Sequence, residues 1–269
     1  MSACILEAIG RHIPIHHALV APFADFRSTR ALAINKGADT HWFSFGRSHS
    51  LSGTLLLALA LCSCASTARQ SIPGACSNNL GSPIHNFCVV TQDVLWRGGR
   101  SDKNGDAWLI QKGVRTIVNL ELIFDDKRAL GQATVDDARN YKVGYFRIRD
   151  SELLRLLAPS VVDDHVAHFL AILSQQPKPV YVHCRYGENR TGVMVAAFRL
   201  IIEGASDDAA IEELKRYHGL WSRVDEGYIR SLSAARREEI KRKVVEWIPK
   251  VKMDAQVVCA KGACVVSNE

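Results

Sequence analysis

The chain has 269 residues, of which 47% are hydrophobic, and it carries 34 Lys and Arg against 28 Asp and Glu. This composition is ordinary for a globular protein, and the absence of an internal repeat or low-complexity tract excludes repeat architectures. The net charge of +6 is mild. It suits an anionic substrate or a membrane surface without identifying either.

The first predicted feature is an uncharged apolar run of 11 residues from Leu51 to Leu61, preceded by Arg47. The run is too short to span a bilayer and is typical of the hydrophobic region of a secretory signal. The residues Cys62-Ser63-Cys64 that follow look like a bacterial lipobox, in which a small residue precedes the cysteine that is lipidated. We therefore predict an extension and signal over residues 1–64, lipidation at Cys64, and a place in the bacterial cell envelope, lipid-anchored or periplasmic.

Two alternatives for the N-terminal part stay open. The run could be a buried helix, and the protein could then be cytoplasmic. The segment before Arg47 is about 46 residues long and has no Met after Met1, which is far longer than an ordinary signal allows. Either translation starts near Arg47 at a non-Met codon, or the chain has an unusual extension. Residues 65–89 are interpreted as a linker.

Strands and helices alternate in the next part of the chain. A short strand with a Gly-Arg turn is predicted at 94–101, and a helix at 106–112 is followed by Gly113. The β-branched segment 114–120 and the segment 143–148 are predicted strands. This alternation predicts an α/β fold with a central, mostly parallel sheet flanked by helices.

Three further helices are predicted outside the central motif. The helix at 160–175 has one apolar face, made of Val162, Val166, Phe169, Leu170 and Leu173. Helices are also predicted at 206–217 and at about 231–247. Opposite charges alternate along the last of them, which indicates a solvated face and not a nucleic-acid site.

The most informative segment is the run from His183 to Gly192, in which Arg190 follows Cys184 by six positions. An apolar strand at 178–183 precedes it, and an apolar helix at 191–203 that ends at Gly204 follows. Backbone N–H groups and the helix dipole favour an anion at such a junction. We expect the phosphate to be bound by the loop residues Arg185, Tyr186, Gly187, Glu188, Asn189 and Arg190.

Each part of this run has a chemical use. A cysteine at a helix N-terminus beside positive charge can have its pKa lowered from about 8.5 and react as a thiolate. Gly187 lets the backbone curl, and the planar guanidinium of Arg190 can hold two phosphate oxygens. Thr191 places a hydroxyl beside the sulfur, where it could stabilise the leaving thiolate.

The pattern of His183-Cys184, five residues, Arg190 and Thr191 resembles the signature of the protein tyrosine and dual-specificity phosphatase superfamily. The resemblance covers roughly residues 90–245, strongly at 183–192 and loosely elsewhere, and predicts a phosphatase-like domain over residues 90–248. It implies hydrolysis of phosphomonoesters through a cysteinyl-phosphate, with His183 orienting the nucleophile and with no metal or cofactor. The alternatives are a rhodanese-type sulfur carrier, a buried structural cysteine, and a phosphate-binding module without catalysis.

Cleavage of a phosphate ester also requires a proton donor for the leaving oxygen. Asp150 is the first candidate, because it follows the strand at 143–148 and precedes Cys184 by 34 positions, which is similar to dual-specificity phosphatases. Glu152 could serve instead. Asp163 and Asp164 are weaker candidates, because they lie in the first turn of the helix at 160–175.

The loop composition also bears on the substrate. Relatives that act on inositol phosphates have lysine-rich loops, whereas Glu188 stands in this loop and Arg185 compensates only in part. This predicts a phosphorylated protein, with phosphotyrosine first, or a small phosphomonoester. An inositol phosphate or phosphoinositide is the alternative.

The eight cysteines bear on the compartment. With Cys64 lipidated and Cys184 catalytic, four remain after the signal: Cys76, Cys88, Cys259 and Cys264. Disulfides suit an oxidising envelope. Cys259 could pair with Cys264 and Cys76 with Cys88, although four cysteines allow three pairings. Residues 249–269 are interpreted as a C-terminal tail.

Overall fold

The computed structural model describes residues 79–136, 139–217 and 220–268. The predicted signal run, the lipidation site Cys64 and Cys76 lie outside these residues. Among the helices of the described ranges, none combines the length and the apolar character needed to cross a bilayer.

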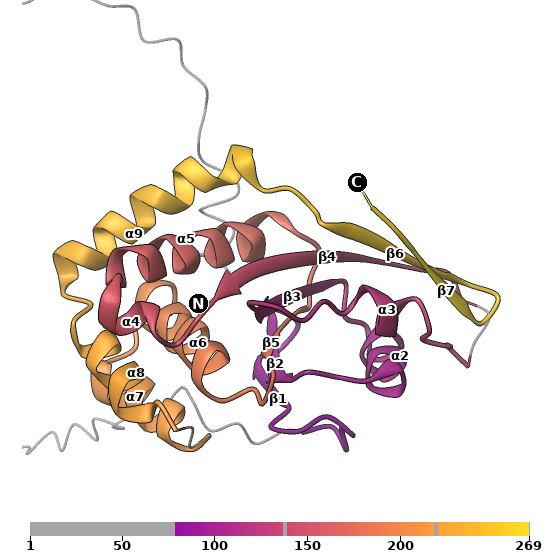
Figure 1. Cartoon of the computed structure of the whole chain (residues 1–269), viewed down its shortest axis with the longest axis horizontal. Helices are drawn as coiled ribbons and strands as arrows, with labels where there is room; N and C mark the ends of the chain where they lie inside the picture. The colour runs from indigo at the N-terminus through magenta and orange to yellow at the C-terminus, as the bar shows by residue number, and fades with distance from the viewer. Residues whose placement is uncertain (1–78, 137–138, 218–219, 269) are drawn as a thin grey trace, which may run out of the picture. The chain divides into compact units, whose positions relative to one another are not determined.

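Seven strands form one sheet in the order β1-β2-β5-β3-β4-β6-β7 (Figure 1). The strands are β1 (Cys88–Thr91), β2 (Leu95–Gly99), β3 (Thr116–Glu121), β4 (Tyr141–Asp150), β5 (Val180–Cys184), β6 (Ala255–Ala260) and β7 (Ala263–Ser267). The central strands β2, β5, β3 and β4 are parallel, and the outer pairings of β1, β6 and β7 are antiparallel. The predicted α/β fold with a mostly parallel sheet is therefore confirmed.

Helices cover both faces of the sheet. They are α2 (Lys103–Lys112), α3 (Lys127–Leu130), α4 (Leu154–Leu157), α5 (Pro159–Gln175), α6 (Asn189–Ile201), α7 (Asp207–Lys215), α8 (Ser222–Arg230), α9 (Ala234–Trp247) and the short 3₁₀ helix η1 (Ile248–Lys250). Helices α4 to α9 lie on one side of the sheet and α2 and α3 on the other (Figure 1). Helix α8 was not predicted, and Gly227 in its middle weakens the helical pattern.

The sheet separates two hydrophobic cores, and successive residues of a strand enter opposite ones. In β5, Val180 and Val182 pack in the core beneath α5 and α6, whereas Tyr181 packs in the core beneath α2. The five apolar residues predicted to form one face of the helix at 160–175 are all buried in α5. Because β5 is buried on both faces, its end at Cys184 lies inside the domain.

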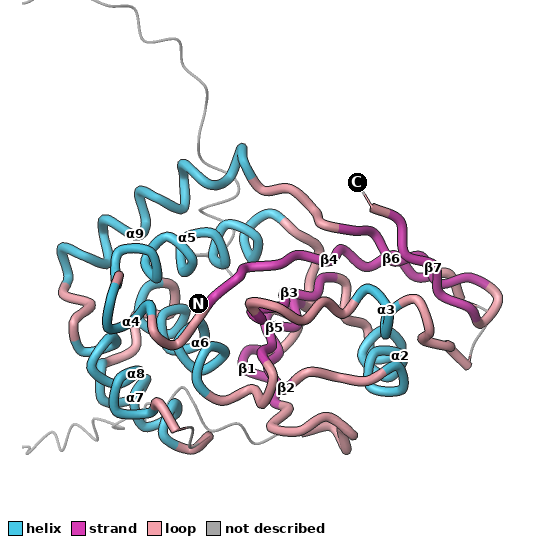
Figure 2. Tube along the Cα trace, viewed as in Figure 1, coloured by secondary structure: helices cyan, strands magenta, loops and turns pink. Residues whose placement is uncertain are grey.

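The domain extends beyond both predicted boundaries. Ile84 and Phe87 are buried before residue 90, and β6 and β7 continue the sheet after residue 248. The interpretation of residues 249–269 as a tail was therefore wrong, because the inward residues of β6 complete the core at the edge of β4 (Figure 2). The predicted disulfide between Cys259 and Cys264 is confirmed and joins paired positions of the β6–β7 hairpin. Cys88 is also disulfide-bonded.

Candidate active site

The phosphate loop, residues 184–190, connects β5 to α6. Cys184 is the last residue of β5, and Arg190 is the second residue of α6. Cys184 is buried, and it is the free cysteine of the part of the chain that the structure describes. The loop therefore brings together a thiol, a guanidinium and the N-terminal turn of a 13-residue helix.

Gly187 is required by the path of the loop. It has a φ of +71°, and a Cβ atom there would lie 2.6 Å from the backbone nitrogen of Gly99. A Cβ atom on Gly99 would lie 3.2 Å from the carbonyl oxygen of Arg185, and one on Gly98 would lie 3.1 Å from the ring of the buried Tyr181. The phosphate loop thus packs backbone against backbone on the end of β2, which no residue with a side chain would allow.

A buried arginine forms a hydrogen bond to the backbone of the phosphate loop. Arg97 in β2 has no exposed surface, and its Nη2 donates a hydrogen bond to the carbonyl oxygen of Gly187. Its guanidinium stacks on the ring of Tyr217, 3.6 Å from the ring centroid. The sequence predicted only that Arg97 lies in a short strand. Gly98 and Gly99, which follow it, are typical of a place where another backbone segment approaches closely, and they could have indicated this contact.

His183 is held by a carboxylate that was also missed. Its Nε2 lies 2.9 Å from Oδ2 of Asp126, which in turn accepts a hydrogen bond from Asn119 at 2.8 Å. Burial alone would lower the pKa of His183, but the charge and hydrogen bond of Asp126 outweigh it and raise that pKa. The imidazole next to Cys184 is therefore oriented and favours its cationic form.

Thr191 lies in the first turn of α6 with its side chain fully buried. Its Oγ1 has no hydrogen-bond partner among the described residues. Asn189, predicted to bind phosphate, instead directs its side chain to Asp225, and Nδ2 donates to Oδ2 at 2.7 Å. Arg185 and Tyr186 are exposed, and Glu188 is half-buried at the N-cap of α6.

The β4–α4 segment, residues 150–157, carries both acid candidates. Glu152 is 24% exposed at its side chain, and its Oε1 lies 2.7 Å from Nε of Arg190. Asp150 has no exposed surface, and its two oxygens are taken by Arg155 at 2.9 Å and His165 at 3.0 Å. The structure therefore brings Glu152, and not Asp150, to the arginine of the phosphate loop.

The protonation of Asp150 follows from these partners. Burial would raise its pKa, but the hydrogen bond of His165 and the charge of Arg155 outweigh burial and lower the pKa. Asp163 and Asp164 have structural contacts of their own. Asp163 pairs with Arg236 at 2.8 Å, and Asp164 accepts from Nε1 of Trp247 at 3.0 Å.

Exposed apolar side chains gather at the edge of the sheet where Cys184 lies. Seven of the eleven large apolar side chains that are exposed in the described residues lie in the connections after β3, β4 and β5. They are Leu122, Ile123, Phe124, Leu153, Leu156, Leu157 and Tyr186. Because these parallel strands end at the same edge, the seven residues, here called the apolar rim, share that edge with Cys184.

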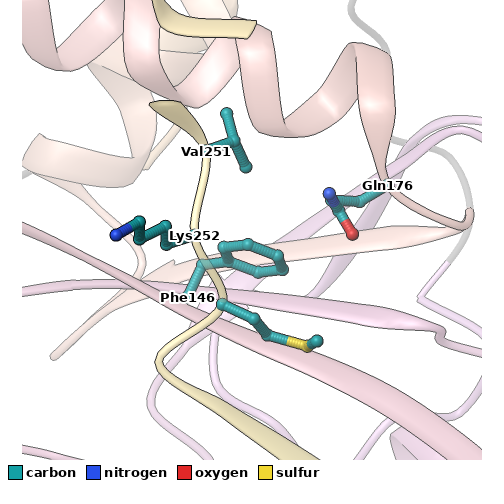
Figure 3. Close-up of a pocket in the computed structure, with 5 residues that line it drawn as sticks. Phe146, Gln176, Val251 and Lys252 are labelled. Atoms are coloured by element: carbon teal, nitrogen blue, oxygen red, sulfur yellow. The ribbon is translucent and has the colours of Figure 1, made fainter. Parts of the chain in front are cut away.

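A separate pocket lies between β4, the end of α5 and the segment before β6 (Figure 3). It is lined by Phe146, Gln176, Val251, Lys252 and Met253. Lys252 points away from Gln176 in Figure 3. None of the five belongs to the phosphate loop or to the β4–α4 segment, so the pocket is not part of the candidate active site.

A comparison with known proteins identifies the family of the chain. Residues 85–231, more than half of the chain, match the family described as DSP-PTPase phosphatase fused to NAD+ kinase. The chain belongs to this family of dual-specificity and tyrosine phosphatase-like domains.

Individual relatives share only part of their length with it. The dual specificity protein phosphatase TpbA of Pseudomonas aeruginosa is 32% identical over 142 residues, which are 52% of this chain and 57% of TpbA. The chloroplastic NAD kinase 2 of Arabidopsis thaliana is 34% identical over 126 residues, 46% of this chain and 12% of the kinase. The chain thus spans about half the length of TpbA and a small part of the plant kinase.

Solved structures of phosphatases align with part of the chain. The crystal structure of TpbA covers 61% of this chain and 91% of its own, with 23% identity and a TM-score of 0.44. The catalytic core of the PP-IP phosphatase Siw14 from S. cerevisiae covers 62% of this chain and 96% of its own, with 16% identity and a TM-score of 0.40.

Proposed function

We propose that the protein hydrolyses phosphomonoesters through a cysteinyl-phosphate intermediate. The observation that carries this proposal is the phosphate loop, which places Cys184 and Arg190 at the two ends of a turn built on a helix N-terminus. The Cys184 thiolate attacks phosphorus and forms the S–P bond while the P–O bond to the leaving group breaks. Arg190 and the loop N–H groups bind the phosphoryl oxygens, whose charge is greatest in the transition state.

Glu152 is the better candidate for the acid that protonates the leaving oxygen. An acid must carry a proton and reach the substrate. Asp150 is enclosed and its partners favour its charged form, whereas Glu152 is partly exposed beside Arg190. A phosphate dianion that binds Arg190 would replace Glu152 there and leave its carboxyl group free to reach the leaving oxygen.

The second half of the reaction uses the same groups in reverse. Once the leaving group has departed, the Glu152 carboxylate removes a proton from water, and the oxygen attacks phosphorus. The S–P bond breaks, inorganic phosphate leaves, and the Thr191 hydroxyl stabilises the departing thiolate. The buried Oγ1 of Thr191, which has no other partner among the described residues, supports this role.

The substrate class is a phosphorylated protein, with phosphotyrosine preferred. The apolar rim offers packing for an aromatic ring and for the residues beside it, whereas an inositol polyphosphate needs several cations. Glu188 at the N-cap of α6 adds negative charge where such a ligand would carry phosphates. The 32% identity to TpbA, named as a dual specificity protein phosphatase, supports the same class.

The function is tested by turnover of a phosphotyrosyl peptide, a phosphoseryl peptide and an inositol polyphosphate. The wild type is expected to prefer the phosphotyrosyl peptide, and Cys184→Ser should lower kcat by roughly 10⁴-fold or more. Turnover by Cys184→Ser at the wild-type rate, or a wild type that binds phosphate without turnover, would overturn the proposal. Glu188→Lys should shift the preference toward the inositol polyphosphate.

The acid is tested separately. Glu152→Gln should lower kcat/KM, which reports the steps up to departure of the leaving group, by about 100-fold for a phenyl phosphate and much less for a nitrophenyl phosphate, whose leaving group needs no proton. The matched change Asp150→Asn should lower stability without this dependence on the leaving group. The reverse pattern would return the acid role to Asp150.

The protein is also proposed to be anchored in the bacterial cell envelope through Cys64. The support is the uncharged run of 11 residues before Cys62-Ser63-Cys64. Mass analysis of the N-terminus of the protein from the membrane fraction should find a lipidated Cys64. An unlipidated chain that begins at Met1 would contradict the anchor.

A further inference from the structure

Arg155 is a buried charged residue that the mechanism above does not use. Its side chain has no exposed surface, and it meets groups from two elements. Nη2 lies 2.9 Å from Oδ2 of Asp150, Nη1 donates to the carbonyl oxygen of Ser151 at 2.9 Å, and Nε lies 2.8 Å from Oδ1 of Asp225. The guanidinium therefore fixes both the residue before Glu152 and the end of β4.

The chain of contacts continues from Arg155 to the phosphate loop. Asp225 in α8 is fully buried, and its second oxygen accepts the hydrogen bond from Nδ2 of Asn189 at 2.7 Å. Asn189 immediately precedes Arg190. The path Ser151–Arg155–Asp225–Asn189 thus links the two residues that flank the Glu152–Arg190 ion pair, each one position before its catalytic neighbour.

Stability alone is a weak reason for such an arrangement. Three ionisable side chains are withdrawn from water here, and buried ion pairs of this kind are often no more stabilising than apolar residues of the same volume. A planar guanidinium does, however, hold several acceptors in fixed directions. The three side chains are therefore better suited to fixing the position of the β4–α4 segment than to stabilising the fold.

We propose that Arg155 is a positioning residue, which holds the β4–α4 segment against the phosphate loop so that the Glu152 carboxyl reaches the leaving oxygen. This inference rests on the proposed function. Arg155 touches neither the substrate nor Cys184, and it acts through Ser151 on one side and through Asp225 and Asn189 on the other. In the first half of the reaction, a misplaced Glu152 slows only the departure of leaving groups that need a proton, so the expected signature is a dependence of kcat/KM on the leaving group.

The test compares Arg155→Lys in the full chain with the wild type on phenyl phosphate and nitrophenyl phosphate. Lysine keeps the charge but cannot meet two carboxylates and a carbonyl at once. We expect kcat/KM for phenyl phosphate to fall by about 10-fold and kcat/KM for nitrophenyl phosphate by less than about 3-fold. Inhibition by inorganic phosphate should stay unchanged, because the phosphate loop is intact.

Two further variants keep the result interpretable. Asp225→Asn removes one partner with almost no change of shape and should reproduce the signature of Arg155→Lys. Arg199→Lys is the matched control, because the buried Arg199 pairs with Glu213 at 2.9 Å and donates to the carbonyl oxygen of Val90 at 2.9 Å, both outside the β4–α4 segment. It should lower the melting temperature and leave both rates unchanged.

The double variant Glu152→Gln/Arg155→Lys decides whether the two residues act together. If Arg155 acts through Glu152, the double variant is no slower on phenyl phosphate than Glu152→Gln alone. Equal losses on both substrates, or losses that add in the double variant, would overturn the positioning role. Failure of the proposed function itself has a different readout, the retained turnover of Cys184→Ser.

Discussion

The phosphate loop and the β4–α4 segment meet at the ion pair of Arg190 with Glu152, but different interactions hold them there. The phosphate loop is shaped by its own backbone, with Gly187 packed on Gly98 and Gly99. The β4–α4 segment is held by side chains from elsewhere, above all Arg155 and Asp225. The proposed nucleophile is therefore positioned by local sequence, whereas the proposed acid is positioned by residues far apart in the chain.

The largest effect is expected from a change in the backbone of the phosphate loop. Gly187→Ala places a Cβ atom 2.6 Å from the nitrogen of Gly99 at a φ of +71°, so the loop must move. We expect kcat/KM to fall by more than about 100-fold, because the loop N–H groups no longer converge on the phosphate. Steady-state kinetics and inhibition by inorganic phosphate measure the loss.

Gly204→Ala is the matched control for this change. Gly204 has a φ of +67° but no atom within 4 Å of the added Cβ. It should lose about 1 kcal/mol of stability from the left-handed backbone and no activity. Equal kinetics for Gly187→Ala and Gly204→Ala would mean that the close approach has no part in catalysis.

The next effect concerns the support beneath the loop. Arg97→Met keeps the length of the side chain but removes the hydrogen bond to the carbonyl oxygen of Gly187. A hydrogen bond from a charged group contributes about 1.5–3 kcal/mol, so kcat/KM should fall by roughly 10-fold or more. Arg115→Met is the control, because Arg115 donates to the carbonyl of its neighbour Val114 at the other end of the strands. A full rate in Arg97→Met would show that the loop needs no such support.

A smaller effect is expected when the pH is lowered, because Asp225, a partner of Arg155, then takes up a proton. Burial raises the pKa of Asp225 to about 6, although Arg155 and Asn189 oppose the shift and Glu152 and Asp150 add to it. Below about pH 6 Asp225 takes up a proton and its ion pair with Arg155 weakens. The wild-type kcat for phenyl phosphate should therefore fall with pH in a way that Asp225→Asn does not show.

Protonation of Asp225 should raise the free energy of unfolding, although it lowers the rate. The pKa of Asp225 is higher in the folded protein than the ordinary value of 3.8, so folding favours the protonated form. As pH falls from about 6 toward 4, the stability of the wild type relative to Asp225→Asn should rise. Urea unfolding across this range measures it, and a constant difference would contradict the assignment.

The smallest effect on activity is expected at the far edge of the sheet. The disulfide between Cys259 and Cys264 closes a short hairpin loop that contacts neither catalytic segment. Changing both residues to Ala should cost up to about 2 kcal/mol of stability and leave kcat/KM unchanged. A loss of activity at full stability would show that β6 and β7 reach the active site in another way.

The sequence predicted much of the fold correctly. The strands at 114–120, 143–148 and 178–183 correspond to β3, β4 and β5, and the apolar face of α5 is buried as expected. It missed α8, whose pattern is interrupted by Gly227, and it took β6 and β7 for a tail. An edge strand such as β6 can be predicted only when the strand that it pairs with is known. That partner, β4, lies about 110 residues earlier in the chain.

What the sequence determined by itself is the phosphate loop. Cys184, Gly187, Arg190 and Thr191 lie within eight consecutive residues between a strand and a helix, and these elements bring them together wherever the rest of the chain lies. Only the tertiary structure decided the other half of the site. Asp126 reaches His183, Arg97 reaches Gly187, and Glu152 rather than Asp150 reaches Arg190. These choices depend on the order of parallel strands and on which side chains are buried, because a carboxylate acts as an acid only where packing leaves it free to reach the substrate.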